Sequence, residues 1–364
     1  MKKKDLIIII IFIMFLTLPS VLYWFLKDKM DLTNYENRNL YVKPELNFKN
    51  ITQFPRNYEN YFNDHLAFKN EIRKTRSNIL YNVFNISSSP RVIVGEDGWL
   101  FYNSRALEDG DSISDYRNFS RYSDDDKEEI KDSLLKTRDT LKKQNIDFYI
   151  LVAPNKENVY SDKLEEIIKR SKNKESKTED LINYLEKNTD LNITYPKEQL
   201  IKNRKINDTY YKYDTHWNYY GAYLGVTELM KEIDSNFSSP KVSLSSFMSG
   251  GDLTKMNLTP KMENKEPSVN GFYDNIKYEC EDSVYKICTS NNSIYDKTIL
   301  FVGDSFRTAT IQYLAKLYKK SIFIHRNSYE EDLIKKYNPD IVIYEAVERY
   351  SRTLKNTHIL TANS

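Results

Sequence analysis

The sequence is poor in cysteine and histidine and carries almost no net charge. Its 364 residues include two cysteines and four histidines, and 54 Lys and Arg residues nearly balance 52 Asp and Glu residues. The net charge of +2 offers no positive field for a nucleic acid, so we expect no nucleic-acid partner. Three of the histidines (65, 325 and 358) show no ligand spacing, and no histidine cluster accompanies the cysteines. We therefore expect no metal site.

The first 26 residues differ from all the others. Lysines at positions 2–4 precede an apolar run over residues 6–26, which at about 1.5 Å per residue spans roughly 30 Å. The lysines should stay in the cytoplasm, so the chain after Lys27 should lie outside. A cleaved signal peptide shares this basic start. We expect an uncleaved anchor, because no small-x-small site follows the run and residues 23–25 (Tyr-Trp-Phe) resemble interfacial anchors.

The two cysteines, Cys280 and Cys288, are separated by only seven residues. Outside the membrane, a disulfide that closes this small hairpin is one expectation, and two free thiols are the alternative.

Strands that alternate with helices predict an α/β domain with a largely parallel sheet. We divide the chain into a cytoplasmic tip and transmembrane anchor (1–30), a stalk and helical lead-in (31–90) and a catalytic domain (91–364). In the last part we expect a hairpin over 92–102, strands at 147–154, 298–302, 321–325 and 341–344, and helices at 124–145, 176–188, 218–233, 308–319 and 330–336. Residues 234–293 are interpreted as a polar loop region.

A nucleophile candidate follows the strand at 298–302, in the sequence Gly303-Asp304-Ser305-Phe306. This position puts Ser305 at the carboxyl edge of the sheet, where open α/β folds place their sites. The N–H groups of Phe306 and Arg307, at the start of the next helix, can face a developing oxyanion. The alternative is that Ser305 only caps that helix.

An acid and a base candidate occur in Asp214-Thr215-His216-Trp217. At a spacing of two, the side chains would diverge in a helix, so we expect an extended or turn segment. There the carboxylate can fix the tautomer of the imidazole. A buried histidine without a function, or a metal ligand, is the alternative.

These strings, in this order, resemble the alginate O-acetyltransferase family of the AlgX and AlgJ type and the related DHHW proteins. Further matches lie at residues 63–69, 92–102, 152–160, 250–253 and 343–349. The resemblance spans about residues 55–350 and implies an SGNH-hydrolase-like fold, with a mostly parallel sheet flanked by helices. It matches Ser305 to the nucleophile, His216 to the general base and Asp214 to its orienting acid. Arg307 and Asn155, each after a strand, are further candidates for the oxyanion site.

The resemblance also implies the partners. We expect an extracytoplasmic polysaccharide O-acetyltransferase that needs no cofactor and is anchored in the cell membrane by its N-terminal helix. A membrane-bound O-acyltransferase (MBOAT) would supply the acetyl group, and an exopolysaccharide would accept it. Two alternatives stay open: a carbohydrate acetylesterase with the same triad, and a non-catalytic glycan-binding scaffold of the cell envelope.

Overall fold

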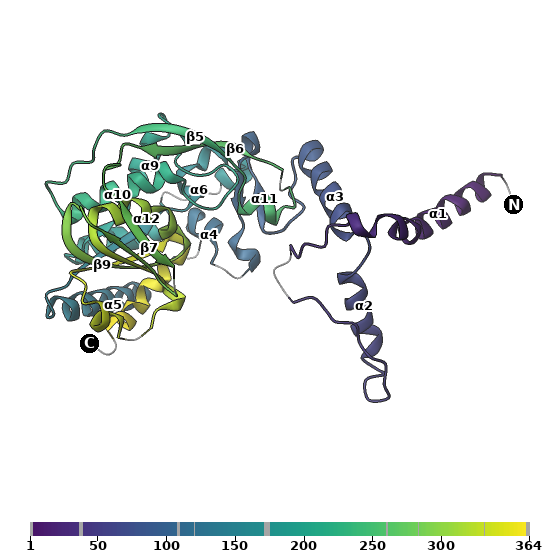
Figure 1. The fold of residues 1–364 in the computed structure, drawn as a ribbon, viewed down its shortest axis with the longest axis horizontal. Coiled ribbons are helices and arrows are strands. Elements are labelled where there is room, and N and C mark those ends of the chain that lie inside the picture. Colours follow the sequence, from purple (N-terminus) through teal and green to yellow (C-terminus); the bar gives the residue numbers. More distant parts are fainter. Residues whose placement is uncertain are drawn as a thin grey trace. The chain divides into compact units, whose positions relative to one another are not determined.

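The computed structural model describes residues 3–35, 39–107, 110–119, 121–170, 175–259, 261–282, 284–330 and 332–361, so Lys2 of the lysine cluster lies outside the described residues. The chain divides into two compact units (Figure 1). Unit 1 comprises Met1–Ser89 and Lys255–Pro260, and unit 2 comprises Pro90–Thr254 and Lys261–Ser364. All of the predicted site residues belong to unit 2.

Unit 1 is largely helical. Its first helix, α1 (Lys3–Leu26), covers the predicted apolar run. Among the described residues it is the one helix long and apolar enough to cross a membrane, a test that a signal sequence also passes. The short η1 (Lys27–Lys29) follows it. The helical lead-in contains two further helices, α2 (Phe54–Asp64) and α3 (Lys69–Phe84).

Unit 2 is built on a seven-stranded sheet with the order β4-β3-β11-β9-β10-β8-β7. Its first five strands in this order are parallel, and β8 and β7 pair antiparallel at one edge. The α/β prediction is confirmed, with a sheet that is mixed rather than wholly parallel. The strands are β3 (Asp147–Ala153), β4 (Ile193–Thr194), β7 (Tyr278–Asp282), β8 (Lys286–Ser290), β9 (Tyr295–Gly303), β10 (Tyr318–His325) and β11 (Ile341–Val347).

Helices cover both faces of this sheet. Along β3, Tyr149, Leu151 and Ala153 enter one core cluster, and the residues between them enter another. The first cluster contains side chains of α10 (Tyr219–Ile233) and α12 (Ile311–Leu317). The second contains side chains of α5 (Asp124–Lys142), α8 (Lys177–Asn188) and α13 (Leu333–Tyr337). Figure 1 shows α10 and α12 on one side of the sheet and α5 on the other. Burial on both faces explains the continuous apolar runs of the central strands.

Local sequence sets the beginnings of two of these helices. Ser123 and Asp126 form a capping box at α5, and Ser176 and Glu179 form one at α8. Each box satisfies two backbone N–H groups that the first helical turn leaves free. The remaining helical segments are η2 (Glu96–Gly98), η3 (Ser104–Leu107), α4 (Ser112–Arg117), α6 (Lys156–Val159), η4 (Ser161–Lys163), α7 (Glu166–Lys169), α9 (Lys197–Asn203), η5 (Ser305–Thr310), η6 (Arg326–Ser328) and η7 (Glu348–Thr361).

The segment 234–293 is not the polar loop that we expected. It holds the two-stranded sheet of β5 (Ser243–Ser249) and β6 (Asn264–Asn270), the helix α11 (Asp252–Met256), and the edge strands β7 and β8. The side chains of β5 are exposed or half-buried, so no apolar run marks it. In β7 and β8, Cys280 and Cys288 lie opposite each other and form a disulfide.

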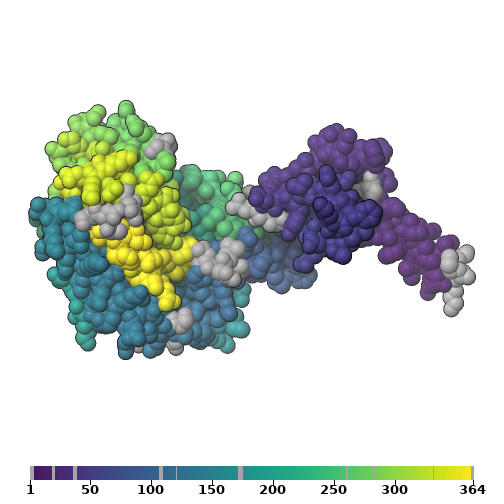
Figure 2. Space-filling view, turned by 90° about the horizontal axis from the view of Figure 1, so that it is seen from below, coloured from purple at the N-terminus to yellow at the C-terminus, as the bar shows by residue number. Residues whose placement is uncertain are grey.

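The first and the last elements of unit 2 lie outside the seven-stranded sheet. The predicted hairpin exists as β1 (Val92–Val94) and β2 (Leu100–Tyr102), which pair antiparallel. At the other end of the chain, η7 packs along α5, where Thr357 contacts Ser133 and Thr137. Figure 2 shows this C-terminal segment in yellow.

Candidate active site

The structure brings the three predicted triad residues together. The distance between His216 Nε2 and Ser305 Oγ is 2.7 Å, and that between His216 Nδ1 and Asp214 Oδ1 is 2.6 Å. Asp214 Oδ1 also accepts the backbone N–H of His216 at 3.0 Å. Ser305 is exposed, whereas His216 and Asp214 are half-buried. A hydroxyl, an imidazole and a carboxylate linked in this order can activate an alcohol for acyl transfer.

The serine is placed by the end of β9. A side chain at Gly303 would come within 2.9 Å of Glu345 Cβ on the neighbouring strand β11, so this position leaves no room for one. The buried Asp304 then accepts the N–H of Phe306 through Oδ1 (2.9 Å), and its Oδ2 accepts the N–H of Val347 (2.8 Å). Asp304 thus caps η5 and links the turn that carries Ser305 to β11 by hydrogen bonds.

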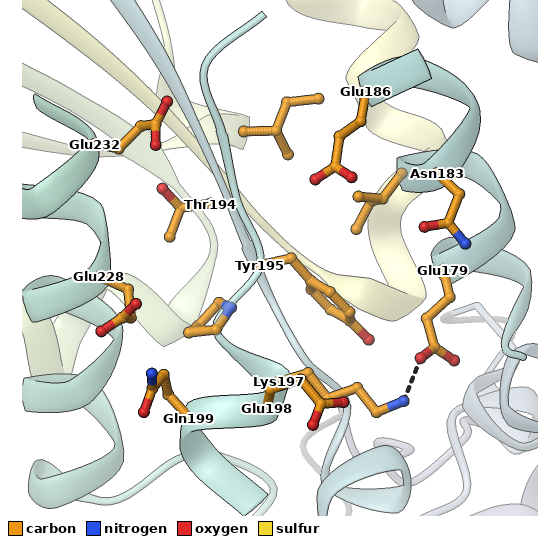
Figure 3. Close-up of a pocket in the computed structure, with 13 residues that line it drawn as sticks. Glu179, Asn183, Glu186, Thr194, Tyr195, Lys197, Glu198, Gln199, Glu228 and Glu232 are labelled. Carbon is orange, nitrogen blue, oxygen red and sulfur yellow. Dashed lines mark hydrogen bonds and ion pairs between the residues drawn. The ribbon is translucent and has the colours of Figure 1, made fainter.

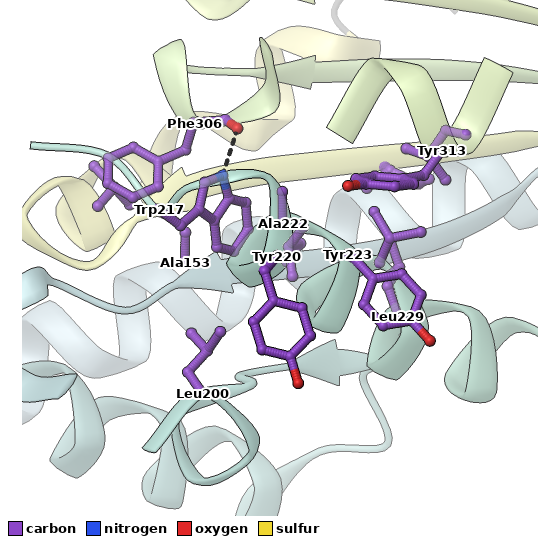
Figure 4. Packing of buried hydrophobic residues seen from close by; sticks show 14 of the residues in the cluster. Ala153, Leu200, Trp217, Tyr220, Ala222, Tyr223, Leu229, Phe306 and Tyr313 are labelled. Carbon is purple, nitrogen blue, oxygen red and sulfur yellow. Dashed lines mark hydrogen bonds between the residues drawn. The ribbon is translucent and has the colours of Figure 1, made fainter. Parts of the chain in front are cut away.

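A buried tryptophan joins the Asp-His loop to the serine turn. Trp217 is fully buried, and its Nε1 donates to Phe306 O at 2.9 Å (Figure 4). The ring of Phe306 in turn lies 4.8 Å from the ring of His216. Trp217 also forms a β-bridge with Tyr210, and Asn218 caps α10 by accepting the N–H of Gly221. The imidazole therefore sits in a bend between a turn and the bridge residue Trp217, which agrees with the prediction of an extended or turn segment.

A second acidic residue, Asp252, supports Asp214, and sequence reasoning missed this contact. Asp252, at the start of α11, donates its backbone N–H to Asp214 Oδ2 at 3.0 Å. Its own carboxylate accepts the N–H (2.9 Å) and the hydroxyl (2.7 Å) of Thr215. The sequence signal for this contact is the glycine that precedes Asp252. A Cβ on Gly251 would lie 2.8 Å from Asp214 N and closer still to Tyr213 O, so a residue with a side chain would not fit there.

The electrostatics of the site favour a strong base. Burial alone would raise the pKa of Asp214, but the hydrogen bond and charge of His216 outweigh it and lower this pKa to about 2. Burial would lower the pKa of His216, yet the hydrogen bond to Asp214 and the charges of Asp214 and Asp252 raise it above its usual 6.5. Burial and the charge of Asp214 raise the pKa of Asp252. His216 accepts a proton only when neutral, so activity should be lost as the pH falls through a value above 6.5.

The loss of activity at low pH forms the acidic limb of the pH–activity profile. The variant Asp252→Asn should move this limb to lower pH, because it removes one of the charges that raise the pKa of His216. We also expect kcat to fall by up to about 100-fold, the cost of displacing a catalytic group by about 1 Å. The measurement is kcat against pH with a chromogenic acetyl ester. Asp274→Asn, which removes an acid paired with Lys316 rather than with the site, is the matched control. An unchanged limb in Asp252→Asn would contradict the role given to Asp252.

The groups that we expected at the oxyanion have other partners. The N–H of Phe306 donates to Asp304 Oδ1, and Arg307 donates both its N–H (3.3 Å) and its Nη1 (2.8 Å) to Asp304 O. Asn155 is fully buried: its Nδ2 donates to Asp115 Oδ2, and its Oδ1 accepts from Arg349 N. Because capping and burial engage all three residues, we assign none of them to the oxyanion.

Two other features of the described residues concern ligands. Among the described residues, one group of possible metal ligands has all its ligand atoms within 4.8 Å of one another. It consists of Asp214, His216 and Asp252. The hydrogen bonds given above account for these atoms. Separately, a pocket of about 460 Å³ lies beside β4 and holds none of the triad residues (Figure 3). It is lined by Glu179, Glu186, Glu198, Glu228, Glu232 and neighbouring side chains.

The chain is similar to a known family of acetyltransferases. The model of the SGNH hydrolase-like domain of the acetyltransferase AlgX matches residues 92–317. The chain belongs to this family. The fold is thus the SGNH-hydrolase-like α/β fold, and the predicted class, an O-acetyltransferase of the SGNH type, is confirmed at the level of the family. None of the curated proteins matches the chain.

The chain is similar to several solved structures. A DHHW family protein from Eubacterium siraeum is 13% identical, with a TM-score of 0.51 over 75% of this chain and 99% of that one. The O-acetyltransferase domain of Pseudomonas putida AlgJ is 15% identical (TM-score 0.47, 73% and 99% covered), and Bacillus cereus PatB1 is 21% identical (TM-score 0.49, 71% and 96% covered). At 13% identity, the likeness to the DHHW family protein concerns the fold alone.

Proposed function

We propose that the chain is a membrane-anchored, extracytoplasmic polysaccharide O-acetyltransferase that works through a Ser305–His216–Asp214 triad. One observation carries the proposal: Ser305 Oγ and Asp214 Oδ1 lie at hydrogen-bond distance from the two opposite nitrogens of one imidazole. The apolar α1 supports the anchor, and the family supports the acetyl chemistry. The same reasoning divides the chain into an anchor (1–30), a lead-in (31–90) and a catalytic domain (91–364).

The reaction proceeds in two half-reactions. His216 Nε2 takes the hydroxyl proton as Ser305 Oγ attacks the carbonyl carbon of an acetyl ester. The bond from that carbon to the donor oxygen then breaks, and the proton passes from His216 to the departing oxygen. In the second half, a sugar hydroxyl gives its proton to His216 Nε2 and attacks the acetyl carbon. The bond from that carbon to Ser305 Oγ then breaks, and His216 returns the proton to Ser305 Oγ, which restores both residues. Asp214 keeps Nδ1 protonated throughout and stabilises the imidazolium.

Donor and acceptor follow from the location and the family resemblance. A domain outside the membrane is separated from cytosolic acetyl-CoA, so an MBOAT partner that carries acetyl groups across the bilayer is the proposed donor. The proposed acceptor is an exopolysaccharide, which an anchored enzyme meets at the cell surface.

The test is to incubate the full-length protein in detergent with a chromogenic acetyl ester, with and without an oligosaccharide. We expect ester cleavage to speed up with the sugar and the sugar to gain acetyl groups, as measured by mass spectrometry. Ser305→Ala in parallel corrects for uncatalysed transfer. Release of acetate with no acetylated sugar across a panel of glycans would show an acetylesterase instead.

A further inference from the structure

Lys156 is a buried lysine with an unusual set of partners. It lies in the 152–160 motif, for which the family resemblance gave no role, and it begins α6 directly after Asn155. Its side chain is 3% exposed. The ammonium donates to three main-chain carbonyls: Leu100 O at 2.7 Å, Lys212 O at 3.0 Å and Asp214 O at 3.0 Å.

These contacts suit a charged amine. An ammonium has three N–H donors and no acceptor, and here each donor has its own carbonyl. The rings of Trp99 and Phe101 lie 5.0 and 5.3 Å from Nζ, within reach of a cation–π attraction. Burying a charge is costly, so a site that satisfies each donor indicates that the protonated form is the one the fold is built to hold.

The three carbonyls come from two segments that lie far apart in the sequence. Leu100 belongs to the β1–β2 hairpin, whereas Lys212 and Asp214 belong to the loop that carries the triad. The N–H of Leu100 also donates to Lys212 O at 3.2 Å. Lys156 therefore fastens the main chain of Asp214 to the hairpin, and the carboxylate of the same residue reaches His216. A shift of this carbonyl would move the acid of the triad with it.

We propose that Lys156 is a positioning residue for the acid of the triad, and that its ammonium form is needed for activity because it fixes the main chain of Lys212–Asp214 against the hairpin. This inference rests on the proposed function of the triad. It gives the 92–102 and 152–160 motifs a shared purpose: one supplies a carbonyl and two rings, and the other supplies the cation.

Titration of this amine offers a readout. Burial lowers the pKa of Lys156 from its ordinary 10.5 to about 8, although the carboxylates that face it oppose this shift. Those carboxylates are Asp214, Asp252, Glu157 and Glu266. A neutral amine has two donors and a lone pair, so one carbonyl would lose its partner and face the lone pair. Activity should accordingly fall as the pH rises through about 8.

Deprotonation of Lys156 would not itself destabilise the fold. The pKa of Lys156 is lower in the folded protein than in the unfolded chain, so between pH 8 and 10.5 the unfolded chain binds the extra proton. By linkage, this group makes the free energy of unfolding rise over that range. An activity that falls while Lys156 itself favours the fold separates positioning from general stability.

The experiment compares Lys156→Met and Lys156→Arg with the wild type, using the full-length protein and a chromogenic acetyl ester from pH 6 to 10. Methionine keeps the length of the side chain and removes the donors. For it we expect kcat to fall about 100-fold at every pH, the cost of a misplaced catalytic group, with KM within about twofold. Arginine stays charged at every pH, so it should keep kcat within about tenfold and abolish the alkaline limb.

Two controls identify the source of a failure. Lys197→Met removes another buried lysine, paired with Glu179 beside the separate pocket, and should leave kcat and the limb unchanged. Ser305→Ala should be inactive, and if it is not, the proposed function fails. If Ser305→Ala is inactive but folded Lys156→Met keeps kcat within about threefold, only the present inference fails.

The pH profiles give the remaining outcomes. An arginine variant with the wild-type limb would overturn the role of the charge. Should neither variant fold, the wild-type profile decides: a fall through about pH 8 with the fold intact supports the inference, and a flat kcat to pH 10 overturns it.

Discussion

Replacing Ser305 with alanine should lower acetyl transfer by on the order of 10³–10⁶-fold, the range found when a member of a nucleophilic triad is removed. The variant deletes the oxygen that lies 2.7 Å from His216 Nε2. The fold should survive, because the serine side chain is exposed and the cap of η5 comes from Asp304 instead. The measurement is the initial rate of sugar acetylation by the purified full-length protein, with the melting temperature recorded alongside.

Thr308→Ala is the matched control for this prediction. Thr308 is exposed in the same η5 segment and lies three residues after the nucleophile, so it tests loss of a nearby hydroxyl. It should leave the rate unchanged. In cells, polymer acetylation that persists in the Ser305→Ala strain would indicate the non-catalytic scaffold that the sequence left open.

The central sheet and the local settings of Ser305, His216 and Asp214 could be predicted because each depends on short, local patterns. A continuous apolar run identified β3, β9 and β11, since strands covered on both faces need no polar positions. The spacing of Asp214 and His216 excluded a helix, and the strand before Gly303 placed Ser305 at a sheet edge. What the sequence could not supply was the meeting of the two loops, which depends on the buried contact of Trp217 with Phe306.

Main-chain contacts explain most of what was missed. Asp252 supports Asp214 through a backbone N–H, and Lys156 reaches it through a backbone carbonyl, so neither side chain forms a recognisable pair with it in the sequence. The strands on either side of Asp252, β5 and β6, have many exposed or half-buried residues and carry no apolar run. The partner of the Phe306 N–H group was missed for a different reason: Asp304, one residue before the serine, accepts this N–H as the cap of η5.

The end of the expected helix 308–319 could not be predicted from the sequence either. The structure has η5 and α12 there, and Lys319 already belongs to β10. Tyr318 and its neighbours suit either a buried helix or a strand by composition. Parallel pairing with β9 selects the strand: the register runs from Lys320 to His325, and Tyr318 pairs with Tyr295 across a register shift.

Gly251→Ala should abolish most of the activity and destabilise the fold, whereas Gly250→Ala should do neither to a comparable extent. A Cβ on Gly251 would clash with Tyr213 O and would lie 2.8 Å from Asp214 N, both of which are main-chain atoms. Main chain cannot turn aside as a flexible side chain can, so the Tyr213–Asp214 segment must shift. A displacement of about 1 Å at a catalytic group can cost on the order of 100-fold in rate.

The adjacent glycine makes the comparison sharp. A Cβ on Gly250 would meet Met262 O at 3.1 Å and Thr254 Oγ1 at 3.5 Å, contacts that need a movement of only a few tenths of an ångström. We expect Gly251→Ala to lose about 1–3 kcal/mol of unfolding free energy, the usual cost of overpacking, together with a fall in kcat of about 100-fold or more. The measurements are urea unfolding and kcat for both variants. Equal losses in the two would show that the close approach of Gly251 to Tyr213 does not set the position of Asp214, and the support that Asp252 gives through the same turn would then lose its structural basis.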